Sequence, residues 1–228
     1  MKRFAACPPV TPPLAESEFT AFRLQTGFSL LELLVVISIM AVLFGLVVPS
    51  VSNLLRSNET TNAADKVLAV LSNARHEAIA LNRAVEVRIY GYAERGEPGA
   101  VKRFRAIQTF LEPDNPSQSW KSLDKLQKLP SSMVFDSGAI LSPLIGSLQS
   151  YPGSSGTTSD FRIPSIGADY DFVRFSFRAD GSTSLDKTQK WFLTIKSLNE
   201  PDNSTALPKN YAMVQVFPSR GAIKIYRP

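Results

Sequence analysis

Residues 27–48 read GFSLLELLVVISIMAVLFGLVV, and this stretch constrains the fold more strongly than the rest of the chain. From Phe28 to Val48 it holds 21 residues with a single charged side chain, Glu32. A helix of this length spans about 30 Å, the thickness of the hydrocarbon core of a bilayer. A buried core helix rarely runs so far without a polar face. The pattern therefore predicts a transmembrane helix at 28–48.

The residues before this segment indicate a leader that differs from an ordinary secretory signal. Such a signal places its apolar run soon after a basic start and ends it at a small-residue cleavage site. Here the Pro-rich stretch PPVTPP separates Lys2 and Arg3 from the apolar run, and no such site follows Val48. Arg23 supplies a positive flank directly before the run. Because positive flanks stay on the cytoplasmic side, we expect a cytoplasmic N-terminus.

The single carboxylate of the apolar run needs a partner. A carboxylate at the centre of a bilayer costs about 2.5–3.5 kcal/mol on insertion scales, so it is usually paired. A cut after Gly27 would create a new α-amino group on Phe28, four residues before Glu32. In an array of packed helices, the amine of one subunit could then neutralise the carboxylate of its neighbour.

The residues Gly27-Phe28-Ser29-Leu30-Leu31-Glu32-Leu33 closely resemble the type III signal of type IV prepilins and type II secretion pseudopilins. The resemblance implies that residues 1–27 are a leader, which prepilin peptidase removes by cutting after Gly27. It also implies that the new N-terminal residue Phe28 is methylated and that Glu32 aids assembly. Pro49 stands where long pilin helices are often kinked, so the resemblance extends through it.

The same resemblance implies a place in the cell and a set of partners. We expect a single pass through the bacterial inner membrane, a periplasmic C-terminal head, and a filament as the assembled state. The expected partners are other pilins or pseudopilins through their N-terminal helices, an inner-membrane assembly platform, and membrane lipid.

Beyond the apolar run, the spacing of apolar residues predicts that one long helix continues to residue 83. Apolar residues recur three and four positions apart, which describes one helical stripe that packs against the protein's own sheet. His76, the only histidine, lies in this helix; without a second histidine or cysteine it suggests no metal site, and we expect it on the surface. The stripe consists of Val51, Leu54, Leu55, Val67, Leu68, Leu71, Ala74, Ala78 and Ile79.

From residue 84 the period changes from helical to alternating, which predicts an antiparallel β head over 84–228. We expect turns at Asp180-Gly181 and at Pro218–Gly221. Residues 112–120 and 146–159 are rich in Pro, Ser, Gly and Asn and are expected to be loops. The expected strands lie at 85–90, 103–111, 173–178, 191–196, 211–217 (apolar on both faces, hence central) and 223–226.

A long helix followed by antiparallel strands is an α+β arrangement, here a pilin-like one. The C-terminal part of the chain resembles the minor pseudopilin H group (GspH/FimT-like). The resemblance lies in the order of its elements, which are FSFRADGS, a further strand, and a terminal hairpin closing on SRGAIKIYRP. Similar cassette pseudopilins occur in Verrucomicrobia.

Cysteine usage and motifs favour a structural role over an enzymatic one. Cys7 is the only cysteine, so no intramolecular disulfide is possible, and too few residues precede it for a lipoprotein signal. Metal-ligand spacing, a nucleophile motif and a phosphate loop are all missing from the sequence, so we expect neither catalysis nor a cofactor or metal.

The alternative function is that of a DNA-binding minor pilin of an uptake pilus. The formal net charge is +5, and the positive excess of the processed chain falls in residues 84–228. Some relatives of the H group bind DNA with basic residues of the C-terminal hairpin, which here implies Arg220, Lys224 and Arg227. Lys102, Arg103 and Arg105 form a second basic cluster in the sequence. A solvated basic hairpin that keeps an edge strand from pairing is the competing interpretation.

Overall fold

The computed structural model describes residues 28–94, 101–115, 119–153, 163, 165–167, 169–202 and 204–228, without the side chains of residues 46–56. The chain divides into two units, Met1–Val47 and Val48–Pro228. The expected leader, with Cys7 and Gly27, lies outside the described residues. In the first unit, the described residues form the N-terminal part of helix α1, whose full extent is Leu30–Ala80.

Helix α1 has helical backbone across Pro49 and ends three residues before the expected boundary at 83. Asn82 follows it with a φ of 50°, in the left-handed region that terminates many helices. The kink expected at Pro49 stays a prediction. The side chains of Val51, Leu54 and Leu55 lie outside the described set.

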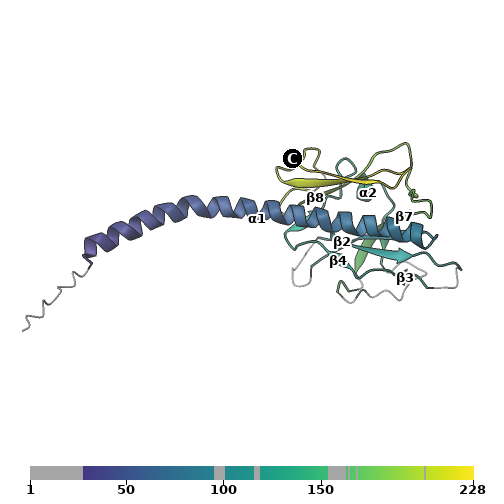
Figure 1. Ribbon diagram of the computed structural model, residues 1–228, viewed down its shortest axis with the longest axis horizontal. Coiled ribbons are helices and arrows are strands. Elements are labelled where there is room, and N and C mark those ends of the chain that lie inside the picture. The colour runs from purple at the N-terminus through teal and green to yellow at the C-terminus, as the bar shows by residue number, and fades with distance from the viewer. Residues whose placement is uncertain are drawn as a thin grey trace, which may run out of the picture. The chain divides into compact units, whose positions relative to one another are not determined.

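The C-terminal half of α1 packs against two antiparallel sheets of the head (Figure 1). Among the described residues the larger sheet has the strand order β3-β2-β1-β7-β6, and β4 also pairs with β2. Its strands are β1 (Val85–Tyr92), β2 (Arg103–Leu111), β3 (Lys121–Ser122), β4 (Gln127–Lys128), β6 (Tyr151–Pro152) and β7 (Tyr170–Phe177). The smaller sheet has the order β10 (Ile223–Tyr226), β9 (Tyr211–Val216), β8 (Trp191–Ser197), β5 (Met133–Phe135). The short helix α2 (Pro143–Gly146) contacts β8.

Each strand expected from the alternating pattern is present, and β9 is internal to its sheet as its two apolar faces predicted. The expected turns are also present, with positive φ at Gly181 and Gly221. Four strands of two or three residues, β3 to β6, were not expected, because so short a segment shows no periodicity. One of them, β6, interrupts the loop expected at 146–159, of which residues 154–159 lie outside the described set.

The main core lies between α1 and the inner faces of both sheets. Val67, Leu71 and Ala78 of the helix are fully buried there, as the stripe predicted. Ile79 was wrongly placed in the stripe, because it lies in the last turn of α1 and is 45% exposed. A fully buried Val or Leu stabilises the fold by roughly 1.5–3 kcal/mol, so this helical face contributes much of the stability of the head.

Polar contacts join the same helix to both sheets. Lys66 Nζ donates to the Lys128 carbonyl oxygen in β4, at 3.0 Å. Arg75 Nε donates to the Arg220 carbonyl oxygen in the β9–β10 turn, at 3.1 Å. These bonds fix the helix against an element of each sheet.

A second, aromatic cluster lies on the outer face of the larger sheet, away from α1. It contains Tyr90, Tyr92, Phe110 and Tyr170, with Phe172 and Trp120 packed against it. Glu86 and Arg88, which alternation placed on an exposed strand face, are only 4% and 5% exposed beside this cluster. The alternating pattern therefore identified the inner face correctly but missed that the outer face is also covered.

Candidate functional site: the N-terminal segment and the cations of the head

The described chain begins with a capped helix start. Glu32 N–H donates to Ser29 Oγ at 3.1 Å, and Leu33 N–H donates to the Ser29 carbonyl oxygen at 3.2 Å. Ser29 is therefore the N-cap, with Glu32 at the third helical position, the spacing of a capping box. Phe28 precedes the helix and is 79% exposed. The sequence signal Ser-x-x-Glu could have located this boundary.

Glu32 is exposed in the first turn of α1, where a carboxylate is favoured by the positive end of the helix dipole. The apolar side chains around it are also exposed, with Leu30 at 84% and Leu31 at 74%. Ser38 Oγ donates to the Leu34 carbonyl oxygen at 2.7 Å, so this hydroxyl has an acceptor within the helix. An exposed apolar surface of this extent marks a site of contact with lipid or with other protein.

In the part of the chain that the structure describes, no helix is both long and apolar enough to cross a membrane.

The three cations of the C-terminal hairpin do not converge on one surface. Arg220 lies exposed in the β9–β10 turn, and Lys224 lies on the outer face of edge strand β10 with its Nζ 4.8 Å from the Tyr226 ring centroid. Arg227 points toward α1, where its NH2 pairs with Asp65 Oδ1 at 2.6 Å. Only Lys224 thus stands on the open face of the hairpin.

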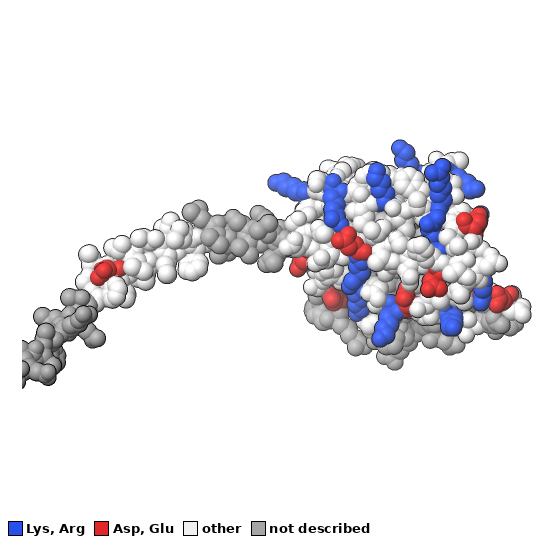
Figure 2. Space-filling view, viewed as in Figure 1, with Lys and Arg blue, Asp and Glu red and all other residues white. Residues whose placement is uncertain are grey.

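The second basic cluster is neutralised by carboxylates. Lys102 Nζ lies 2.7 Å from Asp169 Oδ1 and 3.2 Å from Asp171 Oδ1. Arg103 pairs with Asp202, and Arg105 pairs with Glu94. Figure 2 shows Lys and Arg side chains gathered along the upper part of the visible face of the head, with Asp and Glu side chains mostly in its middle and lower part. Phosphate binding needs cations that are free to replace counterions, so this second cluster does not favour nucleic acid.

His76 is exposed on α1, as expected. Among the described residues, no group of three or more His, Cys, Asp or Glu side chains is placed to hold a metal ion.

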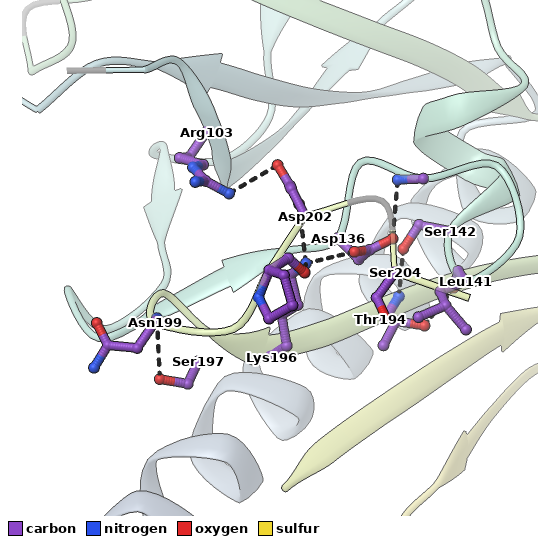
Figure 3. A network of polar contacts seen from close by, with 12 residues as sticks. Arg103, Asp136, Leu141, Ser142, Thr194, Lys196, Ser197, Asn199, Asp202 and Ser204 are labelled. Atoms are coloured by element: carbon purple, nitrogen blue, oxygen red, sulfur yellow. Dashed lines mark hydrogen bonds and ion pairs between the residues drawn. The ribbon is translucent and has the colours of Figure 1, made fainter. Parts of the chain in front are cut away.

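A buried polar network in the smaller sheet was missed entirely from the sequence (Figure 3). Lys196 Nζ on β8 lies 2.5 Å from Asp136 Oδ1, 2.9 Å from Asp202 Oδ1 and 2.7 Å from the Pro201 carbonyl oxygen. Asp202 Oδ2 continues the network to Arg103 NH1 on β2, at 2.8 Å. The network therefore connects both sheets and the loop after β8.

Burial of the Asp202 carboxylate acts to raise its pKa. The hydrogen bond and charge of Lys196, the hydrogen bond of Ser137 and the charge of Arg103 act in the opposite direction and outweigh burial, so the pKa lies below its ordinary value. Alternation had placed Lys196 and Thr194 on an exposed strand face. The segment around α2 covers Thr194, whose N–H donates to Ser142 Oγ at 2.9 Å. Lys196 is covered by Asp136 and by Pro201 and Asp202 of the loop after β8.

Comparison with known proteins identifies the N-terminal segment. Residues 22–48 match the family model described as the prokaryotic N-terminal methylation motif. No curated protein sequence matches the chain.

Solved structures with a similar fold include the type IV minor pilin FimU of Pseudomonas aeruginosa, 12% identical, covering 75% of this chain and 93% of that one with a TM-score of 0.39. They also include the minor pseudopilin EpsH from the type 2 secretion system of Vibrio cholerae, which is 11% identical. That match covers 75% of this chain and 98% of EpsH, with a TM-score of 0.41.

A prokaryotic N-terminal methylation motif therefore coincides with the start of the long helix, and an antiparallel β head follows that helix.

Proposed function

We propose that the chain is made as a precursor that prepilin peptidase cuts between Gly27 and Phe28, with methylation of the new amine of Phe28. The mature subunit is held in the inner membrane by residues 28–48, with its head in the periplasm. It then assembles through its N-terminal helix into a type II secretion pseudopilus or a type IV pilus-like filament, with the assembly platform and other pilins as partners.

The observation that carries this proposal is the single carboxylate in an otherwise apolar, exposed helix. Glu32 is the one charged residue between Phe28 and Val48. Cleavage creates an amine on Phe28, and in a packed array this amine pairs with Glu32 of a neighbouring subunit. Each charge is then neutralised where water is scarce, which removes the cost of leaving a carboxylate alone in the bilayer. The start of the helix after Ser29 supports access to the bond before Phe28, because that bond then precedes the helical turns.

The test is the N-terminus of the mature protein. The full chain is expressed in a bacterial host with and without a prepilin peptidase, extracted from membranes, and analysed by intact mass and N-terminal sequencing. We expect the peptidase to yield a chain that begins at Phe28 and carries one extra methyl group. Gly27→Leu should remain a precursor, because the bulky side chain replaces the glycine that the peptidase recognises.

A matched control is Gly45→Leu, which makes the same exchange within helix α1, where a Cβ would meet nothing within 4 Å. It should be processed normally. A mature chain that keeps Met1, or one cut after Val48, would contradict the proposal.

A further inference from the structure

An amine and a carboxyl group that can react with each other are held in contact inside the head (Figure 3). Lys196 lies on β8, and Asp136 directly follows β5, the neighbour of β8 in the smaller sheet. Lys196 Nζ lies 2.5 Å from Asp136 Oδ1, and both side chains are buried. Condensation of these two groups forms an amide and releases one water molecule.

The amine is fixed beside the group that it would attack. Lys196 Nζ also donates to Asp202 Oδ1 at 2.9 Å and to the Pro201 carbonyl oxygen at 2.7 Å. The fold therefore meets the entropy cost of bringing the two reacting groups together. Burial disfavours charged forms, which favours transfer of one proton from the ammonium to Asp136 Oδ1. The products of this transfer are a neutral acid and a neutral amine, and the neutral amine is a nucleophile.

A backbone donor lies at the other oxygen of the Asp136 carboxyl group. Gly138 N–H donates to Asp136 Oδ2 at 2.9 Å. When the amine attacks Asp136 Cγ, negative charge develops on Oδ2. A hydrogen-bond donor already in place at that oxygen stabilises the transition state. Asp136 thus has the amine at one oxygen and a stabilising N–H group at the other.

A second carboxylate contacts the same nitrogen and can move protons. Asp202 Oδ1 lies against Lys196 Nζ, while its Oδ2 is held by Arg103 NH1 at 2.8 Å. A carboxylate at this position accepts a proton from the nitrogen of the tetrahedral intermediate and passes it to Asp136 Oδ1, which leaves as water. Asp202 is the partly exposed member of the network, so the released water has a short way to solvent. Burial of the other two side chains keeps bulk water from the new bond.

We propose that the head forms an intramolecular amide bond between Lys196 Nζ and Asp136 Cγ, with Asp202 as the proton carrier. One N–C bond forms and the Cγ–Oδ1 bond of Asp136 breaks. The ammonium supplies both protons of the released water, so no oxidant, reductant or co-reactant is consumed. The ion pair of the newly folded chain is the reactant. The bond joins two neighbouring strands across 60 positions of sequence, and it does not depend on cleavage of the leader.

The test measures the intact mass of the full chain, purified in detergent and then incubated at neutral pH for several days. We expect a mass lower than that of the sequence by one water molecule, in a fraction that rises with time. A tryptic digest separates this product from loss of water elsewhere in the chain. Trypsin should fail to cut after Lys196, and peptides 129–162 and 191–209 should be found joined. Tandem mass spectrometry of the joined peptides should place the bond between Lys196 and Asp136.

An internal control comes from a lysine–aspartate pair at the surface. Lys102 Nζ lies 2.7 Å from Asp169 Oδ1, but the Asp169 side chain is 85% exposed. Because water reaches this pair, we expect no bond there, and trypsin should cut after Lys102 in the same sample. The parent chain kept in urea should also stay unlinked, since its two reacting groups meet only in the fold.

Variants separate the reacting groups from the proton carrier. Lys196→Met lacks the amine and should keep its full mass. Asp202→Asn retains both reacting groups but removes the carrier, so the linked fraction should form about a hundredfold more slowly. Asp186→Asn, which changes an exposed aspartate before the same strand, should link at the rate of the parent.

Three results would overturn the inference. The first is a parent chain that keeps its full mass after incubation and is cut completely after Lys196. The second is a joined peptide in which the bond lies between other residues. The third is linking of Asp202→Asn at the rate of the parent, which would show that Asp202 carries no proton in the reaction.

Discussion

Lys196 Nζ and Asp136 Oδ1 lie 2.5 Å apart, and the two side chains are 1% and 0% exposed. Asp136 directly follows β5, and Lys196 lies on the neighbouring strand β8. A charge pair removed from water in this way is tolerated only when both partners are present, because either charge alone would be desolvated without compensation.

We therefore expect Lys196→Met to lower the free energy of unfolding by about 3–5 kcal/mol, since it leaves the Asp136 carboxylate buried and unpaired. The double variant Lys196→Met/Asp136→Leu should lose less than the sum of the single losses. Lys187→Met, at an exposed lysine before the same strand, should change stability by no more than about 0.5 kcal/mol. Urea unfolding of the full chain in detergent, followed by tryptophan fluorescence, measures Lys196→Met, Asp136→Leu, the double variant and Lys187→Met. Additive single losses would show that the pair is not coupled.

Asp202 should make the fold sensitive to acid. Its pKa in the folded state is lowered, chiefly because the hydrogen bond and charge of Lys196 outweigh burial. The pKa of an aspartate in the unfolded chain is about 3.9, and above that pH the ionised Asp202 stabilises the folded state. This stabilisation is lost as the pH falls through the lower pKa that Asp202 has in the folded state. The free energy of unfolding should therefore fall more steeply for the parent than for Asp202→Asn as the pH is lowered from 6 to the point at which acid unfolds the protein. Parallel curves would refute this role.

Gly221 should tolerate no side chain. Its φ is 58°, and a Cβ at this position would lie 2.1 Å from the Gly181 carbonyl oxygen. Because the obstacle is backbone, Gly221→Ala should destabilise the head by about 2–4 kcal/mol. Gly167, with a φ of 94° and nothing within 4 Å, is the matched control, and its replacement by Ala should cost only about 1 kcal/mol. Equal losses in thermal unfolding would show that the contact with Gly181 has no effect.

Glu32 should matter for assembly and not for processing. Under the proposed function, Glu32→Leu removes the partner of the neighbouring Phe28 amine but leaves the helix start and the residues around the cut unchanged. We expect normal cleavage and membrane insertion, with loss of sheared filaments and of cross-links between subunits. Glu32→Asp keeps the charge on a shorter side chain and should retain part of the assembly. Filaments of normal yield from Glu32→Leu would count against charge neutralisation.

The head should show no specific retention of DNA through its hairpin. Arg227 is paired with Asp65, and Lys224 stands apart on the outer face of β10. The hairpin variant is Arg220→Ala/Lys224→Ala/Arg227→Ala, and the control variant, Lys187→Ala/Lys190→Ala/Lys209→Ala, removes three exposed lysines elsewhere. The hairpin variant should change DNA retention at low salt no more than the control variant does. Electrophoretic mobility shifts at several salt concentrations compare the two. A loss confined to the hairpin variant would restore the DNA-binding alternative.

The sequence by itself determined the N-terminal methylation motif and the arrangement of the helix and main strands. Phe28 to Val48 form an apolar run with one carboxylate, and the motif around Gly27 and Glu32 needs no tertiary contact to be recognised, because it is local. Helical and alternating periods likewise identified the buried faces of α1 and of β1, β7 and β8, since a buried face must be apolar whatever covers it.

Only the tertiary structure decided what covers the outer faces of the two sheets. Lys196 and Arg88 alternate with apolar residues exactly as exposed side chains do, yet both are buried by segments distant in the sequence. Their partners, Asp136 and the ring of Phe110, are specified by strand register and by loops such as the one around α2.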